Sequence, residues 1–290
     1  MILSTQTFIP CREHGAIEGV LMLCRAGYDA LDLSLTQREM AEIEALGNRW
    51  HTLADAQREA AESHGVTFVQ AHAPFGGDRE CYFAESVSRF PLAFAYAARL
   101  GVRNIVVHPL HATTSYTGHE EELFCENMKF YKDLLPLARE YDMVIAVENM
   151  WLTHRGSNSC ADDACADPGE HLRYVDALKE TDPDRFTACL DLGHVAVCRR
   201  EPQDAIRILG DRIGCLHVHD VDYHRDLHTM PFMGSLDWDA ICAALKEVGY
   251  RGAFNYEADN FLANLPPETH ETACRLMAQV GRSLIARIEG

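Results

Sequence analysis

Six short apolar runs of this chain each end in a side chain that can bind a metal ion. The six end residues are His72, His108, Glu148, Asp191, His217 and Glu257. They lie roughly 25 to 45 residues apart, which is about one strand plus one helix each time, because a strand–helix–strand unit takes roughly 30 residues or more. Parallel strands that each deliver such a residue at the same end are typical of the active-site rim of a (β/α)₈ barrel.

The remaining sequence completes an alternation of strands and helices. The expected strands cover residues 1–4, 28–35, 66–71, 104–107, 143–147, 186–190, 213–216 and 252–256; the expected helices cover 15–26, 50–64, 84–100, 120–141, 169–180, 202–209, 238–248 and 268–288. The last helix carries one apolar stripe, as an outer barrel helix must, made of Leu276, Met277, Val280, Leu284 and Ile288. No linker divides the 290 residues, and a barrel needs about 250. We therefore predict an α/β fold, a single (β/α)₈ barrel domain over residues 1–290.

Charge and composition exclude several classes of function. The net charge is −18, from 26 basic and 44 acidic residues, which disfavours nucleic acid and anionic membrane surfaces as partners. No apolar run is long enough to cross a membrane, and the N-terminus lacks the pattern of a signal peptide. Eleven cysteines, several on apolar faces, indicate reduced thiols. We expect a cytoplasmic protein.

Three carboxylates and one imidazole form the first candidate site. Glu148, Asp191, His217 and Glu257 make a hard-to-borderline ligand set suited to Zn²⁺ or Mn²⁺, with Mg²⁺ and Co²⁺ as alternatives. Any one of them alone is explained as well by a helix cap or an arginine partner. Together, uncompensated carboxylates at one rim would repel one another and resist ionisation. A bound divalent cation is the simplest remedy.

Five further residues could bind additional metal or the substrate. His72 and His108 beside Glu148, and His194 with Asp226 and His228, each make a two-histidine, one-carboxylate set. Alternatively, His194 donates a hydrogen bond to substrate, and Asp226 with His228 orients it. After His217 come His219 and Asp220, of which we expect one to face outward by strand alternation.

Two long loops, 150–168 and 220–235, follow strand ends and are expected to be functional. They and the other rim loops carry aromatic residues that could cover the apolar face of a sugar, or only pack the loops: Phe8, Phe75, Trp151 and Phe232. Arg155 and Arg225 are the nearest candidates to bind an anionic substrate group. Of these residues, Trp151, Arg155 and His194 are our candidates for substrate binding.

Seven motifs occur in a family-specific order: Ala71-His72-Ala73-Pro74-Phe75, Val107-His108-Pro109, Val147-Glu148-Asn149, Asp191-Leu192-Gly193-His194, His217-Val218-His219-Asp220, Asp226-x-His228 and Tyr256-Glu257. Over residues 66 to 260 the chain therefore resembles the xylose isomerase-like barrel superfamily. That superfamily includes sugar and sugar phosphate isomerases and epimerases, inosose and dehydroshikimate dehydratases, and endonuclease IV.

The resemblance implies different roles in different branches. Among ketose 3-epimerases, residues matching Glu148, Asp191, His217 and Glu257 hold one metal, the two glutamates are the acid/base pair, and a histidine matching His194 contacts substrate. In endonuclease IV, three zinc ions use positions that match all nine metal-binding candidates of this chain. The acidic charge and the lack of a basic DNA-gripping loop are departures from that branch.

These observations predict a metal-dependent sugar or sugar phosphate isomerase or epimerase in carbohydrate metabolism. It would abstract a proton next to a carbonyl, through a metal-stabilised enediolate, with Glu148 and Glu257 removing and returning the proton. An inosose-type dehydratase and an endonuclease IV-like zinc phosphodiesterase are the alternatives. The sequence leaves open which sugar is used, whether it is phosphorylated, which metal and how many ions bind, and whether the chain forms a homo-oligomer.

Overall fold

The computed structural model describes residues 1–75, 86–112, 115–153 and 159–290. An eight-stranded parallel sheet forms its centre, in the order β10-β1-β2-β3-β4-β5-β8-β9. Its strands are β1 (Ile2–Gln6), β2 (Ala30–Ser34), β3 (Thr67–His72), β4 (Asn104–Val107), β5 (Val144–Glu148), β8 (Phe186–Asp191), β9 (Ile213–His217) and β10 (Ala253–Tyr256). Val218 closes the ring, because its N–H donates to Asn255 O at 2.8 Å and its carbonyl accepts from Glu257 N at 3.1 Å. The predicted barrel is confirmed.

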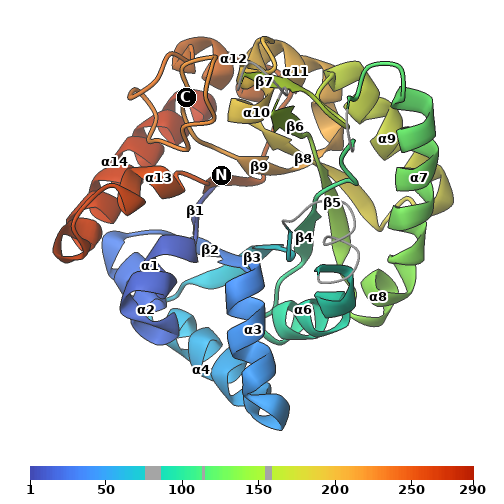
Figure 1. Ribbon diagram of the computed structural model, residues 1–290. Coiled ribbons are helices and arrows are strands. Elements are labelled where there is room, and N and C mark those ends of the chain that lie inside the picture. Colours follow the sequence, from blue (N-terminus) through green and yellow to red (C-terminus); the bar gives the residue numbers. More distant parts are fainter. Residues whose placement is uncertain (76–85, 113–114, 154–158) are drawn as a thin grey trace.

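Helices surround the sheet as an outer ring (Figure 1). They are α2 (Ala16–Ala26), α4 (Trp50–Glu62), α6 (Ser88–Arg99), α7 (Glu120–Asp133), α8 (Leu135–Glu140), α9 (Pro168–Thr181), α11 (Pro202–Leu209), α12 (Trp238–Glu247) and α14 (His270–Glu289). The single helix expected over 120–141 is two helices, since Pro136 lacks the N–H and clashes with the preceding turn. On α14 the predicted stripe was wrong at Leu276, which is 45% exposed; Met277, Leu284 and Ile288 are buried.

Several short elements were not predicted from the sequence. Most of them follow the carboxyl ends of strands and surround the rim of the barrel: α1 (Phe8–His14), α3 (Gln37–Ala45), the antiparallel hairpin β6 (Trp151–Thr153) and β7 (Cys160–Asp162), α10 (Leu192–Val197) and α13 (Asp259–Ala263). The described residues also contain three 3₁₀ turns: η1 (Gly47–Arg49), η3 (Gly210–Arg212) and η4 (Pro267–Thr269). The hairpin lies within the loop 150–168.

The barrel has two apolar regions. Inside the ring, Val106, Ala146, Cys189 and Cys215 pack together from four consecutive strands; the larger core lies between the sheet and the helices. The ten cysteines in the described ranges are free thiols, as predicted. Across those same ranges, no helix combines the length and apolarity that crossing a membrane requires.

Strand register brings the predicted ligands to one rim. Asp191 pairs with His217 across β8 and β9, and Glu148 pairs with Cys189 across β5 and β8. Asp191 is also the N-cap of α10, accepting a hydrogen bond from His194 N at 2.6 Å. This cap fixes the direction of the carboxylate.

Candidate metal centre

Glu148, Asp191, His217 and Glu257 converge in a buried group at the carboxyl ends of the strands. One ligand atom from each lies within 4.8 Å of every other. Nδ1 of His217 is 2.9 Å from Glu148 Oε1 and 2.8 Å from Glu257 Oε2, and 3.9 Å from Asp191 Oδ2. Residues far apart in sequence thus point at one small space.

The donor set of this group fits a divalent cation. Oε2 of Glu257 is buried and lacks hydrogen-bond geometry to its neighbours, whereas Oε1 accepts from Gln6 Nε2 at 2.6 Å. A buried carboxylate oxygen left without a donor is costly, and a cation would satisfy it. Nε2 of His217 also has no hydrogen bond and lies 3.8 Å from Asp32 Oδ2. Oxygen-rich sites with one imidazole suit Mn²⁺, Mg²⁺ or Zn²⁺.

The negative charge of the carboxylates in this group is partly balanced by the protonated imidazole of His217. Burial alone would raise the pKa of Glu148, but its contacts with the neighbouring imidazoles, chiefly that of His217, outweigh burial and hold it well below its usual value. The pKa of Glu257 is lowered as well, with His217 again outweighing burial. Burial opposes the charged form of His217, yet Cys189 and the two glutamates raise its pKa well above the ordinary value. A bound cation would take over the role of this proton.

His72 and His108 contact the other oxygen of Glu148. Their Nε2 atoms lie 3.3 and 3.0 Å from Glu148 Oε2 and 3.1 Å from each other. His72 donates from Nδ1 to Ala73 O at 2.9 Å, which directs Nε2 toward the glutamate. Burial lowers the pKa of His108 to about 4, so it is a neutral imidazole at pH 7. The predicted neighbourhood of these two histidines and Glu148 is present.

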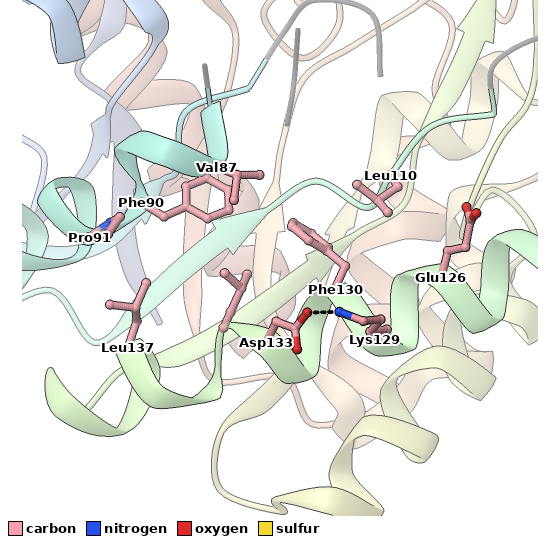
Figure 2. Close-up of a pocket in the computed structure, with 10 residues that line it drawn as sticks. Val87, Phe90, Pro91, Leu110, Glu126, Lys129, Phe130, Asp133 and Leu137 are labelled. Atoms are coloured by element: carbon pink, nitrogen blue, oxygen red, sulfur yellow. Dashed lines mark hydrogen bonds and ion pairs between the residues drawn. The ribbon is translucent and has the colours of Figure 1, made fainter. Parts of the chain in front are cut away.

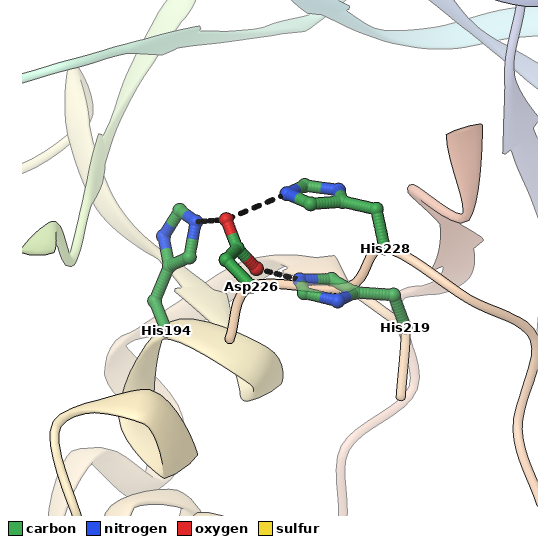
Figure 3. A group of neighbouring side chains, drawn as sticks. All are labelled: His194, His219, Asp226 and His228. Atoms are coloured by element: carbon green, nitrogen blue, oxygen red, sulfur yellow. Dashed lines mark hydrogen bonds and ion pairs between the residues drawn. The ribbon is translucent and has the colours of Figure 1, made fainter. Parts of the chain in front are cut away.

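A second group surrounds Asp226 (Figure 3). Oδ2 of Asp226 lies 2.9 Å from His228 Nε2 and 3.4 Å from His194 Nε2, and it accepts from Trp151 Nε1 at 3.1 Å. His219 Nε2 approaches Oδ1 at 3.8 Å. The four ionisable side chains could hold an ion, since one ligand atom from each lies within 4.8 Å of the others.

Backbone carbonyls orient the imidazoles of the second group. Nδ1 of His194 donates to Asn149 O at 2.8 Å, and Nδ1 of His228 donates to Glu257 O at 2.8 Å. Both Nε2 atoms therefore face Asp226. Although burial disfavours its charge, His194 has a pKa raised to about 10 by Asp191 and Asp226. For His228 burial is likewise outweighed, and Asp226 raises its pKa well above the usual value.

The expected outward turn of His219 or Asp220 is wrong, because both are fully buried. Regular alternation ends with β9 at His217. His219 turns inward, with Nε2 at 3.0 Å from Asp191 Oδ1, and its ring stacks on His228 with centroids 4.0 Å apart. Asp220 accepts from Trp238 Nε1 and from the N–H groups of Val221, Phe232 and Leu236. Sequence reasoning did not assign His219 to the site, although it stands in the motif His217-Val218-His219-Asp220, two residues after a predicted ligand.

A cavity of about 370 Å³ opens onto both groups. Its lining includes Glu148, His194, Asp226, His228 and Glu257, together with aromatic rings of Phe8, Phe75 and Trp151. A second hollow of about 490 Å³ shares Phe8, Phe75, Glu257 and Asp259 with it and adds Gln6, Thr36, Gln37 and Arg38. Three of the four aromatic candidates thus line the site. Phe232 does not appear in either lining and is 56% exposed.

Two other predictions concern arginines. Arg155 lies outside the described residues. Arg225 lies on the surface, where its Nε donates to Asp222 Oδ2 at 2.8 Å. It is not among the described residues that line either cavity. Its role in binding an anionic group stays a prediction, and its described partner is Asp222.

A separate apolar hollow of about 380 Å³ lies on the flank of the barrel, between α6 and the pair α7–α8 (Figure 2). Its walls include Val87, Pro91, Leu110 and Leu137, and the ion pair of Lys129 with Asp133 crosses its edge. None of the predicted ligands is among the described residues that line it.

Comparison with known proteins agrees with this architecture. Residues 23–280 match the family described as xylose isomerase-like TIM barrel. The chain belongs to this family. The uncharacterized protein y4fM of Sinorhizobium fredii is 29% identical over 164 residues, or 56% of this chain, and the chain spans 49% of the length of that relative.

Solved structures share the fold, among them the following two. D-psicose 3-epimerase with D-tagatose from Clostridium cellulolyticum H10 has a TM-score of 0.73 at 13% identity, covering 98% of this chain and 99% of that one. The IOLI protein with a binding zinc atom has a TM-score of 0.71 at 19% identity, covering 99% and 98% of the two chains. At 13% and 19% identity, these similarities show that the chains share the barrel fold.

Proposed function

We propose that this protein is a metal-dependent sugar isomerase or epimerase, which moves a carbon-bound proton next to a carbonyl group. The observation that carries the proposal is the approach of Glu148 and Glu257 to Nδ1 of one buried histidine, His217, at 2.9 and 2.8 Å. The two carboxylates come from strand ends on different sides of the rim, β5 and the end of β10. A solved D-psicose 3-epimerase with the same fold lends support.

Four residues would hold the ion: Glu148, Asp191, His217 and Glu257. When bound, a divalent cation such as Zn²⁺ or Mn²⁺, with Mg²⁺ or Co²⁺ as alternatives, supplies Lewis-acid stabilisation of the negative charge that develops on substrate oxygens. The buried Glu257 Oε2, whose 2.8 Å approach to His217 Nδ1 lacks hydrogen-bond geometry, supports this assignment, and so does the zinc named with the IOLI fold relative.

Glu148 and Glu257 are the proposed acid/base pair. One glutamate, as the carboxylate, removes the proton from one face of the carbon; the other, as the carboxylic acid, delivers a proton to the opposite face, which inverts the centre. Gln6 orients Glu257 by donating to Oε1. The lowered pKa values of both glutamates favour the ionised form, which the glutamate that acts as the base requires.

The remaining rim residues would bind the carbohydrate. Rings of Phe8, Phe75 and Trp151 line the cavity and offer apolar faces for a sugar. His194, with its raised pKa, is a hydrogen-bond donor for a substrate oxygen. Arg155 remains a predicted contact. The first deciding experiment replaces Glu257 with Gln, which keeps the shape but removes the base.

The Glu257→Gln enzyme should lose exchange of the substrate's carbon-bound hydrogen with deuterated water, by roughly 10²- to 10⁴-fold. Proton NMR of D-fructose, D-allulose and D-tagatose in D₂O with added Mn²⁺ or Mg²⁺, quenched and freed of metal before recording, measures this exchange. Glu268→Gln, on the exposed turn η4, is the matched control and should exchange like wild type. Unchanged exchange in Glu257→Gln would refute the assignment. Products that have lost water would indicate the dehydratase alternative.

A zinc phosphodiesterase is the second candidate, favoured by one observation. His72 and His108 on Glu148, and His194 with His228 on Asp226, supply ligands for two further ions beside the central group. The net charge of −18 opposes binding of a polyanion. Metal analysis separates the two: three zinc ions per chain with cleavage of an abasic duplex would support the phosphodiesterase, and one ion without cleavage would exclude it.

A further inference from the structure

An aspartate–histidine pair that belongs to none of the metal-ligand groups lies at the edge of the same cavity. Nδ1 of His111 donates to Asp163 Oδ2 at 2.6 Å. Oδ1 of Asp163 accepts from Ala112 N at 3.0 Å, so both carboxylate oxygens are used. Asp163 has no exposed side-chain surface, whereas His111 is 33% exposed. The acid is therefore a fixed support, and the imidazole is the group that remains accessible.

Two separate parts of the chain build this pair. His111 follows β4, in the segment that continues from His108. Asp163 follows β7, and the hairpin holds it in place, because Trp151 pairs with Asp162 and Met150 N donates to Ala164 O at 3.1 Å. The hairpin therefore positions the buried carboxylate of Asp163 beside Nδ1 of His111.

The position of His111 relative to the metal centre suits contact with a bound substrate. His111, Glu148, Met150 and Trp151 line the same cavity. The ring of His111 lies 6.0 Å from that of His108, whose Nε2 is 3.0 Å from Glu148 Oε2. One imidazole therefore separates His111 from the proposed base. Because Asp163 occupies Nδ1, the other ring nitrogen, Nε2, is the one left to interact in the cavity.

We propose that His111, held by Asp163, binds a hydroxyl group of the substrate at the end remote from the metal. A neutral polyol is the ligand class that fits. The lining also contains Glu148, Asp226, Glu257 and Asp259, and within the described residues of this cavity there is no Lys or Arg. An anionic end would find no lysine or arginine among these residues, whereas a hydroxyl can donate to or accept from the imidazole of His111. The inference deepens the proposed function and takes its ligand class from it.

The deciding variant is His111→Asn. The side-chain amide of asparagine can replace Nδ1–H and keep the bond to Asp163, but it has nothing in the place of Nε2. If the pair only ties two loops together, this variant should behave like wild type. If Nε2 binds substrate, the dissociation constant for the sugar should rise roughly tenfold, as for loss of one well-placed hydrogen bond. Thermal stability and metal affinity should stay unchanged.

The measurement is calorimetric titration of the Mg²⁺-loaded full chain with D-fructose, D-allulose, D-tagatose and D-sorbose, with conversion followed separately. His119→Asn is the matched control, because His119 pairs with Glu122 on the exposed start of α7. Asp163→Asn should weaken sugar binding and also lower the melting temperature, since it puts an amide against two N–H donors.

The outcomes separate this inference from the proposed function. Sugar that binds without being converted would refute the epimerase and still allow the pair to be judged from dissociation constants. Equal dissociation constants for His111→Asn and wild type, for every sugar that binds, would overturn the inference while leaving the epimerase intact. A fall in turnover at unchanged affinity would also overturn it, because that result assigns His111 to proton transfer. Absence of binding by all four sugars would refute the inference as stated.

Discussion

Gly193 lies so close to His219 that a β-carbon at position 193 would be 2.0 Å from Cε1 of the imidazole. His219 Nε2 in turn lies 3.0 and 3.1 Å from the two carboxylate oxygens of Asp191. An added methyl group must therefore displace the ring that supports a proposed metal ligand. We expect Gly193→Ala to lower the affinity for Mn²⁺ by roughly 10- to 100-fold, the usual cost of losing a residue that orients a ligand. Competition with a fluorescent chelator measures it.

A double-mutant cycle tests whether the steric contact is the cause. In a His219→Ala background the space is empty, so adding Gly193→Ala should change the Mn²⁺ affinity little further. If Gly193→Ala costs as much with His219 removed as with it present, the effect comes from the backbone of α10 and not from the imidazole.

Binding of a divalent ion at the central group should release protons and raise stability. The pKa of His217 is raised well above its usual value, because Cys189, Glu257 and Glu148 outweigh burial, so its imidazole is protonated at pH 7. Coordination requires a free nitrogen. The affinity for Mn²⁺ should therefore fall as the pH is lowered. Calorimetry in two buffers of different ionisation enthalpy counts the protons.

The same ion should stabilise the fold by roughly 3 kcal/mol at a free concentration 100 times its dissociation constant. Asp191→Asn should remove most of this gain in melting temperature. Asp204→Asn, at a surface ion pair with Arg207 on α11, is the control and should keep it. A wild-type protein whose melting temperature is indifferent to Mn²⁺, Zn²⁺, Mg²⁺ and Co²⁺ would contradict the metal centre.

The sequence predicted the barrel and its rim because both depend on local signals that repeat. A buried parallel strand is a short apolar run, and its end is marked by the first ionisable residue, as at Glu148 and Asp191. The register of the parallel strands then brings these strand ends to one rim of the barrel. The pairing of Asp191 with His217 follows from the fold alone.

What the sequence did not reveal depends on contacts between irregular segments. His219 lies beyond the end of β9, where alternation no longer applies. His111 and Asp163 meet across 52 positions of the chain, through a loop and a three-residue strand that have no periodicity to detect. Short elements such as α1 and α10 were missed for the same reason: seven and six residues are too few for a helical pattern.

Asp220 should be a structural residue, although it is adjacent to the candidate site. Its two oxygens accept four hydrogen bonds from the loop and helix that follow, including Trp238 Nε1 at 2.9 Å and Leu236 N at 3.1 Å. In Asp220→Asn one acceptor becomes a donor that faces N–H groups. We expect a loss of about 2 to 4 kcal/mol in the free energy of unfolding, measured by urea denaturation of the metal-free protein.

Asp239→Asn is the control for Asp220→Asn, since Asp239 is 86% exposed and only pairs with Arg287. It should cost less than about 1 kcal/mol. A small effect at Asp220 together with a large loss of metal affinity would contradict the structural role and make Asp220 part of the metal centre.

His171 should make the fold sensitive to acid. It is buried in α9 and donates from Nε2 to Val147 O at 2.8 Å, and burial lowers its pKa from 6.5 to about 4. Between about pH 4 and pH 6.5 the imidazole of His171 is protonated in the unfolded chain but neutral in the folded protein. Its contribution to stability is therefore complete above pH 6.5 and is lost as the pH falls toward 4, amounting to roughly 3 kcal/mol. Urea denaturation of the metal-free protein at pH 7 and pH 5 measures the loss.

His171→Gln isolates this contribution, because the amide of glutamine can donate to the same carbonyl but does not titrate. The variant should lose less stability than wild type between pH 7 and pH 5, even if it is less stable at pH 7. His51→Gln, at an exposed histidine, controls for the removal of one imidazole and should follow the wild-type profile. Parallel pH profiles for His171→Gln and wild type would mean that His171 becomes protonated while the protein stays folded. The fold would then not require the neutral imidazole.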